Sequence, residues 1–114
     1  DGMHGVELWQ VGSSGIASLV SATADPVGLN GNSADASPQP LAFVNSTLSF
    51  SAFDGRNGRE LWRISGNGPA ELVEDSLPGG GLRAGASSSN PRDLLAVGGT
   101  VYFTADTETG MGIW

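Results

Sequence analysis

The sequence predicts an all-β fold in which one antiparallel sheet of four strands recurs along the chain. A nine-residue phrase occurs three times, at residues 1–9 (DGMHGVELW), 54–62 (DGRNGRELW) and 106–114 (DTETGMGIW). The phrases start 53 and then 52 residues apart, a spacing that is typical of repeat architectures. The chain has 18 Gly and 6 Pro in 114 residues, and its large apolar side chains fall in short runs between turn residues, as in β-rich proteins.

The similarity between the repeats extends over their full length. When residues 1–53 are placed on residues 54–106 without a gap, 18 of 53 positions are identical. The identical positions are mostly apolar residues, glycines and a proline, which set cores and turns, whereas the differing positions are mostly polar. We therefore expect two repeat units, residues 1–53 and 54–106, with residues 107–114 as the start of a third within one domain.

The phrase itself is expected to contain a strand, at residues 59–64 (RELWRI) in the second repeat. Side chains alternate between the two faces of a strand, so Trp62 and Leu61 should point in opposite directions. Residues 65–68 (SGNG) supply turn chemistry, because Asn-Gly favours the positive φ angles of tight hairpins. The returning strand is expected at residues 70–74 (AELVE).

The other strands are expected to form tight hairpins. The second repeat places strands at residues 94–97 and 100–105 around a Gly-Gly turn, and the first places them at residues 41–44 and 47–52 around an Asn-Ser turn. Each complete repeat then contains four short strands in an antiparallel meander. No segment combines a sustained apolar period of 3.6 residues with helix caps, so we expect essentially no helix.

The apolar side chains predict how these sheets pack. Trp62 and Leu61 place apolar groups on both faces of one strand, which a sheet needs when it lies between two neighbouring sheets. Radially stacked four-stranded sheets, the blades of a β-propeller, fit this pattern and the period; a β-trefoil and a two-domain sandwich are the alternatives. Propellers use about 4–8 blades, so about two blades should belong to a longer array or assemble with other copies.

Charge and motif content exclude several classes of function. The net charge is −7, which argues against the backbone of a nucleic acid or an anionic membrane as a partner. No apolar run is long enough to insert into a membrane. The sequence contains no nucleophile elbow, phosphate loop, Cys-x-x-Cys or His-Glu-x-x-His pattern. We therefore expect a protein that is not an enzyme.

An acidic turn is the candidate metal site. Asp54, Asn57 and Glu60 carry side-chain oxygens within seven residues, and calcium is coordinated by oxygen ligands. The spacing lacks the density of a calcium-binding loop, and the third phrase has Gly112 in place of Glu60. The alternative is that Asp54 makes the turn and that Glu60 accepts backbone hydrogen bonds. Calcium is the only cofactor that these residues suggest, and the alternative is that the chain binds no cofactor.

Three tryptophans are the candidate binding residues, because Trp9, Trp62 and Trp114 recur once in each phrase. Aromatic faces of this kind can present a platform to a glycan. Each of these tryptophans also has apolar neighbours within its expected strand, which favours packing between blades. Both interpretations stay open at this stage.

The phrase and its surroundings resemble the ELWxxDGT repeat family of bacterial secreted and cell-surface proteins. The slots of that pattern are filled by Pro91, Leu94, residues 101–103, Ala105, Asp54, Gly55, Gly58, residues 60–62, Leu72, Val73, Pro78 and Gly79. Two departures stand out: residues 64–67 read ISGN where the family has Ser-Asp-Gly-Thr, and the third phrase lacks the glutamate. The resemblance implies a secreted repeat module that forms a propeller, and it implies no catalytic or binding residue.

These features predict a non-enzymatic, extracellular or cell-surface module with a structural or interaction role, including adhesion and self-assembly. Its expected partners are other copies of itself or the rest of a longer repeat chain, and a surface protein or glycan. The alternative function is glycan binding by a lectin-like propeller.

Overall fold

The computed structural model describes residues 5–22, 29–30, 35–74, 82–83, 87–108 and 110–114. The strands within these ranges are β1 (Trp9–Val11), β2 (Ala17–Leu19), β3 (Gln39–Val44), β4 (Thr47–Phe53), β5 (Arg59–Ser65), β6 (Glu71–Leu72), β7 (Arg92–Val97), β8 (Thr100–Thr107) and β9 (Gly110–Ile113). The prediction of an all-β chain is confirmed for the described residues, which contain no helix. None of these residues belongs to a helix that could cross a bilayer.

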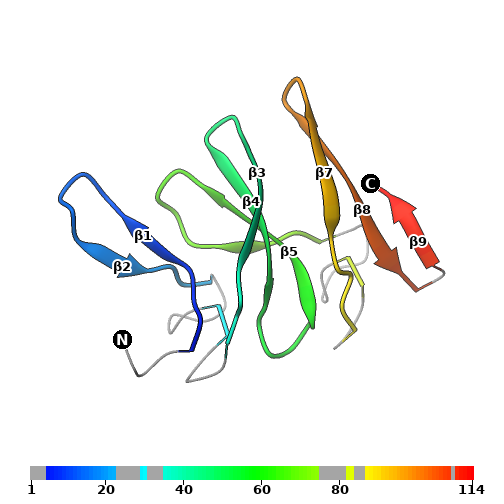
Figure 1. The fold of residues 1–114 in the computed structure, drawn as a ribbon, viewed down its shortest axis with the longest axis horizontal. Helices are drawn as coiled ribbons and strands as arrows, with labels where there is room; N and C mark the ends of the chain where they lie inside the picture. Colours follow the sequence, from blue (N-terminus) through cyan, green and yellow to red (C-terminus); the bar gives the residue numbers. More distant parts are fainter. Residues whose placement is uncertain (1–4, 23–28, 31–34, 75–81, 84–86, 109) are drawn as a thin grey trace.

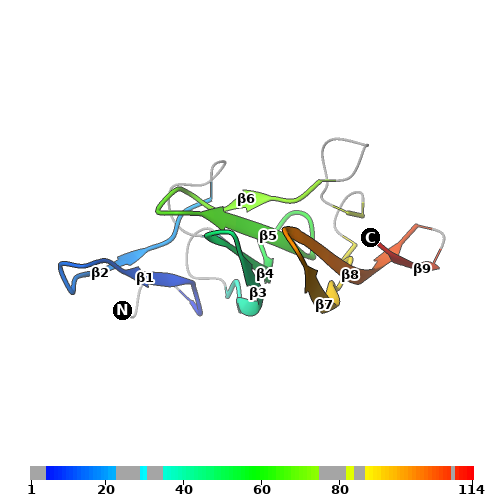
Figure 2. The same ribbon diagram turned by 90° about the horizontal axis from the view of Figure 1, so that it is seen from above.

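The strands form three antiparallel sheets that lie in a row (Figures 1 and 2). The first sheet has the order β1-β2, the second β3-β4-β5-β6 and the third β7-β8-β9. The second sheet is the predicted meander of four strands. The described part of the chain is an open row of sheets and does not close into a barrel or a ring.

Corresponding strands recur in the order that the repeats predict. The first strand of a repeat is β3 or β7, and the second is β4 or β8. The third strand is β1, β5 or β9, and the fourth is β2 or β6. Phe50 pairs with Trp62 in the second sheet. Phe103 and Trp114 exchange two backbone hydrogen bonds of 3.2 and 2.9 Å in the third sheet. We call residues in corresponding positions repeat mates.

The hairpin turns follow the residue types. Asn45 and Ser46 both have positive φ, at 50° and 62°, as a two-residue type I′ turn requires. In the turn at residues 65–68, the positive φ falls on Gly66, at 60°, and not on the Asn-Gly pair that the sequence suggested. Gly68 closes this turn by donating its N–H to the carbonyl of Ser65 over 3.2 Å. Residues 1–4 of the first phrase, and Pro78 and Gly79, lie outside the described residues.

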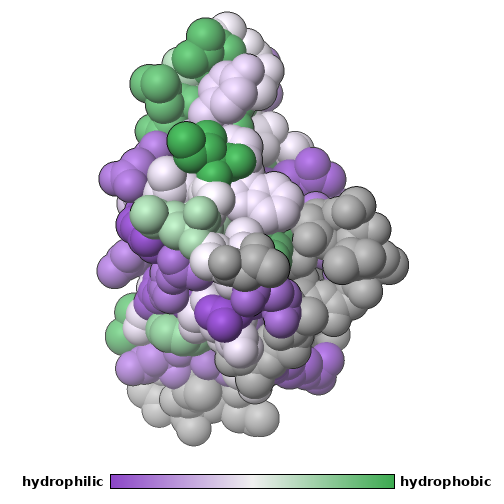
Figure 3. Space-filling model, turned by 90° about the vertical axis from the view of Figure 1, so that its right-hand side faces the viewer, coloured by the Kyte–Doolittle hydropathy of each residue, from purple (hydrophilic) through white to green (hydrophobic). Residues whose placement is uncertain are grey.

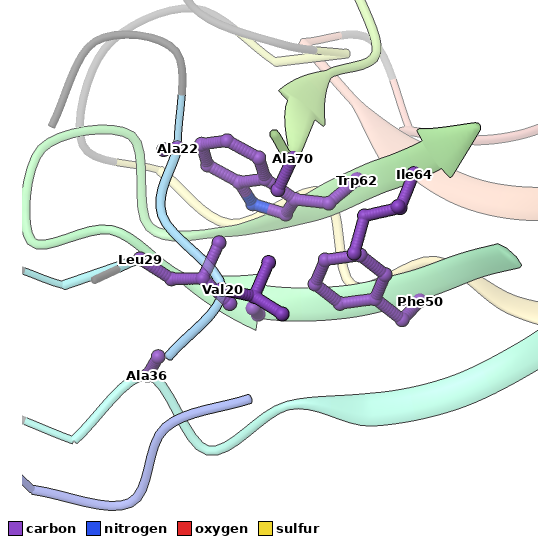
Figure 4. Close-up of a cluster of buried hydrophobic side chains, with 9 residues drawn as sticks. Val20, Ala22, Leu29, Ala36, Phe50, Trp62, Ile64 and Ala70 are labelled. Carbon is purple, nitrogen blue, oxygen red and sulfur yellow. The ribbon is translucent and has the colours of Figure 1, made fainter. Parts of the chain in front are cut away.

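Two apolar clusters hold the row together. The larger lies between the first and second sheets (Figure 4) and contains Val20, Ala22, Leu29, Ala36, Phe50, Ala52, Trp62, Ile64 and Ala70. The smaller lies between the second and third sheets and contains Leu61, Leu82, Phe103 and Ala105. Trp62 and Leu61 therefore serve different interfaces, which confirms that both faces of β5 are apolar because both are covered.

Candidate functional site

The carboxylate of Glu60 is completely buried at the start of β5. One oxygen, Oε2, accepts hydrogen bonds from the N–H of Leu82 over 3.0 Å and from the hydroxyl of Ser89 over 2.6 Å. The other, Oε1, accepts from the N–H of Ser89 over 2.8 Å. Three donors from the connection between β6 and β7 thus converge on one side chain.

The glutamate of the first phrase makes the same kind of contact. Glu7 is buried, and its Oε2 accepts a hydrogen bond from the N–H of Leu29 over 2.9 Å. Its Oε1 accepts from the N–H of Asn30 over 3.3 Å. Leu29 and Leu82 are repeat mates, so each of the first two phrases uses its glutamate to hold the connection that leads to the next sheet. We call this arrangement the glutamate anchor.

Backbone hydrogen bonds around the anchor repeat as well. The carbonyls of Val6 and Arg59, which are repeat mates, accept from the N–H groups of Ala36 and Ser89 over 2.9 and 3.0 Å. Ala36 and Ser89 in turn accept, through their carbonyls, from the N–H groups of Phe53 and Asp106 over 2.9 and 2.7 Å. Each connection is therefore fixed between the phrase that precedes it and the following sheet.

Burial and hydrogen bonding shift the pKa of Glu60 in opposite directions. Loss of solvent raises the pKa of its carboxyl group, and the negative charge of Asp54 adds to this. The hydrogen bonds from Ser89 and Leu82 oppose the shift, because they favour the ionised form. A carboxylate with no exposed surface and three fixed donors has no oxygen left for a substrate, so its role is to position the backbone.

Of the three candidate metal ligands, only Asp54 and Asn57 take part in the acidic turn. Asp54 Oδ1 accepts from the backbone N–H groups of Arg56 and Asn57 over 2.8 and 2.7 Å, and its Oδ2 accepts from the Asn57 side-chain amide over 2.6 Å. This is the Asx-turn geometry that aspartate favours. Glu60 is directed to Leu82 and Ser89 instead, so the three candidate ligands do not converge. The described residues contain no cluster of three or more acidic, histidine or cysteine side chains suited to a metal.

The conformation and close surroundings of Gly55 explain why a glycine follows the aspartate in this turn. Its φ is +77°, a conformation that residues with a side chain rarely adopt, and a Cβ there would lie 2.5 Å from Oδ1 of Asn30. Asn30 also belongs to the glutamate anchor of the first repeat. The acidic turn of one repeat therefore packs against the anchored connection of the preceding repeat.

The three tryptophans fall into two classes. Trp62 is 4% exposed and packs among Val20, Leu29 and Phe50, whereas Trp9 is 42% and Trp114 is 39% exposed. The indole N–H of Trp62 is buried and has no hydrogen-bond partner among the described residues. The structure thus places Trp62 in the core, and leaves Trp9 and Trp114 accessible to a partner.

Two hollows lie beside these elements. A groove of about 370 Å³ runs between the first and second sheets, lined by Leu8, Trp9, Gln10, Val20, Phe43, Ser46, Leu48, Ile64, Gly66 and Asn67. A second hollow, of about 450 Å³, lies at the acidic turn and is lined by Asp54, Arg56, Asn57, Trp62, Ala70, Glu71, Leu72 and Glu74. The groove is the more apolar of the two and borders the larger core cluster.

Sequence reasoning identified Glu60 as an acceptor of backbone hydrogen bonds but not its partners. Leu82 and Ser89 lie 22 and 29 residues beyond it, and no local pattern marks so distant a contact. The available signal was the Gly-Leu pair, residues 28–29 and 81–82, which is identical in two connections that differ at most other positions. Comparison with protein-family models, with characterised proteins and with solved structures gives no match to this chain.

Proposed function

We propose that this chain is a non-enzymatic structural and interaction module whose repeats are blades of a β-propeller-type array. The observation that supports this most strongly is the glutamate anchor, which recurs with the same connecting leucine and the same flanking backbone bonds in two repeats. Such an anchor fixes how one sheet follows another. The contact with the leucine is common to both repeats, whereas the other carboxylate oxygen accepts from Asn30 in the first repeat and from Ser89 in the second.

The polar groups of the phrase support a non-enzymatic role. The carboxylates of Glu7 and Glu60 are buried and bound to backbone N–H groups, and Asp54 is bound within its own turn. The acidic residues of the phrase therefore serve packing and turn formation. An extracellular or cell-surface location is part of the proposal, and it follows from the resemblance of the phrase to the ELWxxDGT repeats.

A tandem polypeptide tests the proposal. Because the third phrase corresponds to the first, residues 1–105 repeated three times in direct succession would continue the same spacing through six blades, within the range of about 4–8 that propellers use. We expect a compact, disc-shaped particle by electron microscopy and a single thermal transition above that of one copy, because each inner sheet gains a neighbour. An extended or heterogeneous particle with an unchanged transition would contradict the proposal.

Glycan binding is the second candidate, and the exposure of Trp9 and Trp114 is the observation that favours it. Aromatic faces of tryptophan stack on apolar surfaces of ligands while the indole N–H remains free to donate a hydrogen bond. Binding on a glycan array that is lost in Trp9→Ala or Trp114→Ala, with the fold intact by circular dichroism, would favour this candidate over the first.

A further inference from the structure

We propose that Asn67 is a site of self-modification, at which the chain converts its own asparagine to aspartate and isoaspartate through a cyclic imide. Asparagine followed by glycine favours this reaction, because glycine has no Cβ to hinder the attack of its backbone nitrogen. Two such pairs lie within the described residues, Asn57-Gly58 and Asn67-Gly68, and a third, residues 30–31, extends outside them. The structure favours the reaction at Asn67 and opposes it at Asn57.

The reaction at Asn67 needs only water and hydroxide. Hydroxide removes the proton from the backbone N–H of Gly68, and the nitrogen attacks the side-chain carbonyl carbon of Asn67. A new C–N bond closes the imide ring, and the bond to the side-chain nitrogen breaks. That nitrogen takes a proton from water and leaves as ammonia, which restores the hydroxide. Water then opens the ring at either carbonyl, so the product is aspartate or isoaspartate, with one negative charge more than the net charge of −7.

The turn between β5 and β6 holds Asn67 weakly. Asn67 is exposed, and its side chain makes no hydrogen bond to the described residues. The N–H of Gly68 donates to the carbonyl of Ser65 over 3.2 Å, at the long end of the range for such a bond. Release of the attacking nitrogen therefore costs one weak hydrogen bond, and the side chain is free to turn toward it.

The turn between β1 and β2 has the same backbone hydrogen bond. Gly15 donates its N–H to the carbonyl of Gly12 over 3.0 Å, and these two residues are the repeat mates of Gly68 and Ser65. The residue before Gly15 is Ser14, which has no side-chain amide. The geometry of the turn thus belongs to the repeat, but only the second repeat places the reactive group in it.

Asn57, in contrast, is held by Asp54. Its side-chain amide donates to Oδ2 of Asp54 over 2.6 Å, and its backbone N–H donates to Oδ1 over 2.7 Å. The side chain must give up a hydrogen bond to a charged group before its carbonyl carbon can meet the nitrogen of Gly58. The loss of such a bond slows the reaction about tenfold or more.

The charges around the two asparagines also differ. Asn57 lines the hollow at the acidic turn, whose walls carry three acidic side chains and one arginine. Asn67 lines the groove between the first and second sheets, and none of the described residues there carries a charge. Negative charge opposes both the removal of the backbone proton and the charge that then develops on the carbonyl oxygen. The surroundings of Asn67 therefore favour the reaction.

The two turns lie at opposite ends of the second sheet. Figure 1 shows the turn between β5 and β6 at the upper end, with the other hairpin tips, and the turn between β4 and β5 at the lower end. Figure 3 shows the same division at the third sheet, where the upper end is mostly apolar or neutral and hydrophilic side chains lie below it. The contrast between the two sites thus follows from how each repeat is built.

Peptide mapping by mass spectrometry tests the inference on the 114-residue chain at mildly alkaline pH. Conversion is measured at each asparagine as the mass gained when a hydroxyl group replaces an amino group, and isoaspartate is separated from aspartate by chromatography. We expect conversion at Asn67 to be about tenfold or more faster than at Asn57 in the folded chain. In urea, which releases both side chains, the two rates should become similar.

Asp54→Ala tests the restraint, because it removes the acceptor that holds Asn57. It should speed conversion at Asn57 in the folded chain and leave the rate at Asn67 unchanged. Asn67→Gln is the matched control, since its longer side chain closes the corresponding ring far more slowly, and the products at position 67 should disappear. Circular dichroism shows whether both variants keep the fold. Persistence of Asn67 in the folded chain would overturn the inference, and so would equal conversion of Asn57 and Asn67 before urea is added.

Discussion

Trp62→Ala is expected to lower the free energy of unfolding by about 3–5 kcal/mol, the usual cost of removing a large aromatic side chain from a core. Trp62 is buried among Val20, Leu29 and Phe50, which come from both sheets of the first interface and from the connection between them (Figure 4). Its removal leaves a cavity that spans all three. Urea unfolding followed by circular dichroism measures the loss.

The first phrase supplies the control for this substitution. Trp9 occupies the same position of the repeat but is half exposed, so Trp9→Ala should cost about 1 kcal/mol or less, as surface substitutions usually do. If both variants lost the same stability, the assignment of Trp62 alone to a packed interface would be wrong. Trp62→Phe provides a milder variant should the alanine variant be unfolded without urea.

Glu60→Gln is expected to cost about 1–3 kcal/mol although it changes only one oxygen to an amide nitrogen. The carboxylate accepts from three donors on Leu82 and Ser89. A glutamine amide offers a single oxygen, so its NH₂ group would face the backbone N–H of either Leu82 or Ser89 and remove that hydrogen bond from a buried site. The loss should appear as a lower urea midpoint at neutral pH.

Glu71→Gln is the matched control for the anchor. Glu71 pairs with Arg63 across β5 and β6 at an N–O distance of 3.1 Å, and both side chains are more than half exposed. Exposed ion pairs of this kind contribute at most about 1 kcal/mol. Equal losses for Glu60→Gln and Glu71→Gln would show that the three donors do not depend on the carboxylate of Glu60.

The contribution of Glu60 to the free energy of unfolding depends on pH with a defined sign. Burial raises the pKa of Glu60, so the folded chain holds this proton at a higher pH than the unfolded chain does. The resulting stabilisation is fully present below the unfolded pKa and is lost as pH rises through the folded pKa. Asp106 has a pKa lowered by Asn90 and Arg92, so its contribution is lost in the opposite direction, as pH falls. Glu60→Gln should remove only the first of these slopes.

The sequence predicted what depends on neighbouring residues and on the repeat. Alternation along β5 placed Trp62 and Leu61 on opposite faces, and the turn predicted at Asn45-Ser46 joins β3 and β4. Both features are local, because strand parity and turn chemistry are set within a few residues. The recurrence of the phrase likewise predicted the recurrence of its strands.

What the sequence did not predict depends on contacts between distant segments. The same tryptophan is 4% exposed at position 62 and 42% exposed at position 9, because burial is decided by whether a sheet lies in front of it and not by the phrase. The donors for Glu60 lie in a connection without regular structure, to which strand patterns do not apply.

Residue-resolved amide hydrogen exchange on the 114-residue chain tests most directly the claim that the phrase anchors each connection to the next sheet. The N–H groups of Leu82 and Ser89, and of their repeat mates Leu29 and Ala36, should be protected to a degree comparable with β4 and β5, because all four are bonded to a phrase. In Glu60→Gln, protection should fall at Leu82 and persist at Leu29, and it should fall less at Ser89, whose N–H also donates to the carbonyl of Arg59. Rapid exchange at all four positions in the unmodified chain, with β4 and β5 protected, would contradict the anchored connection.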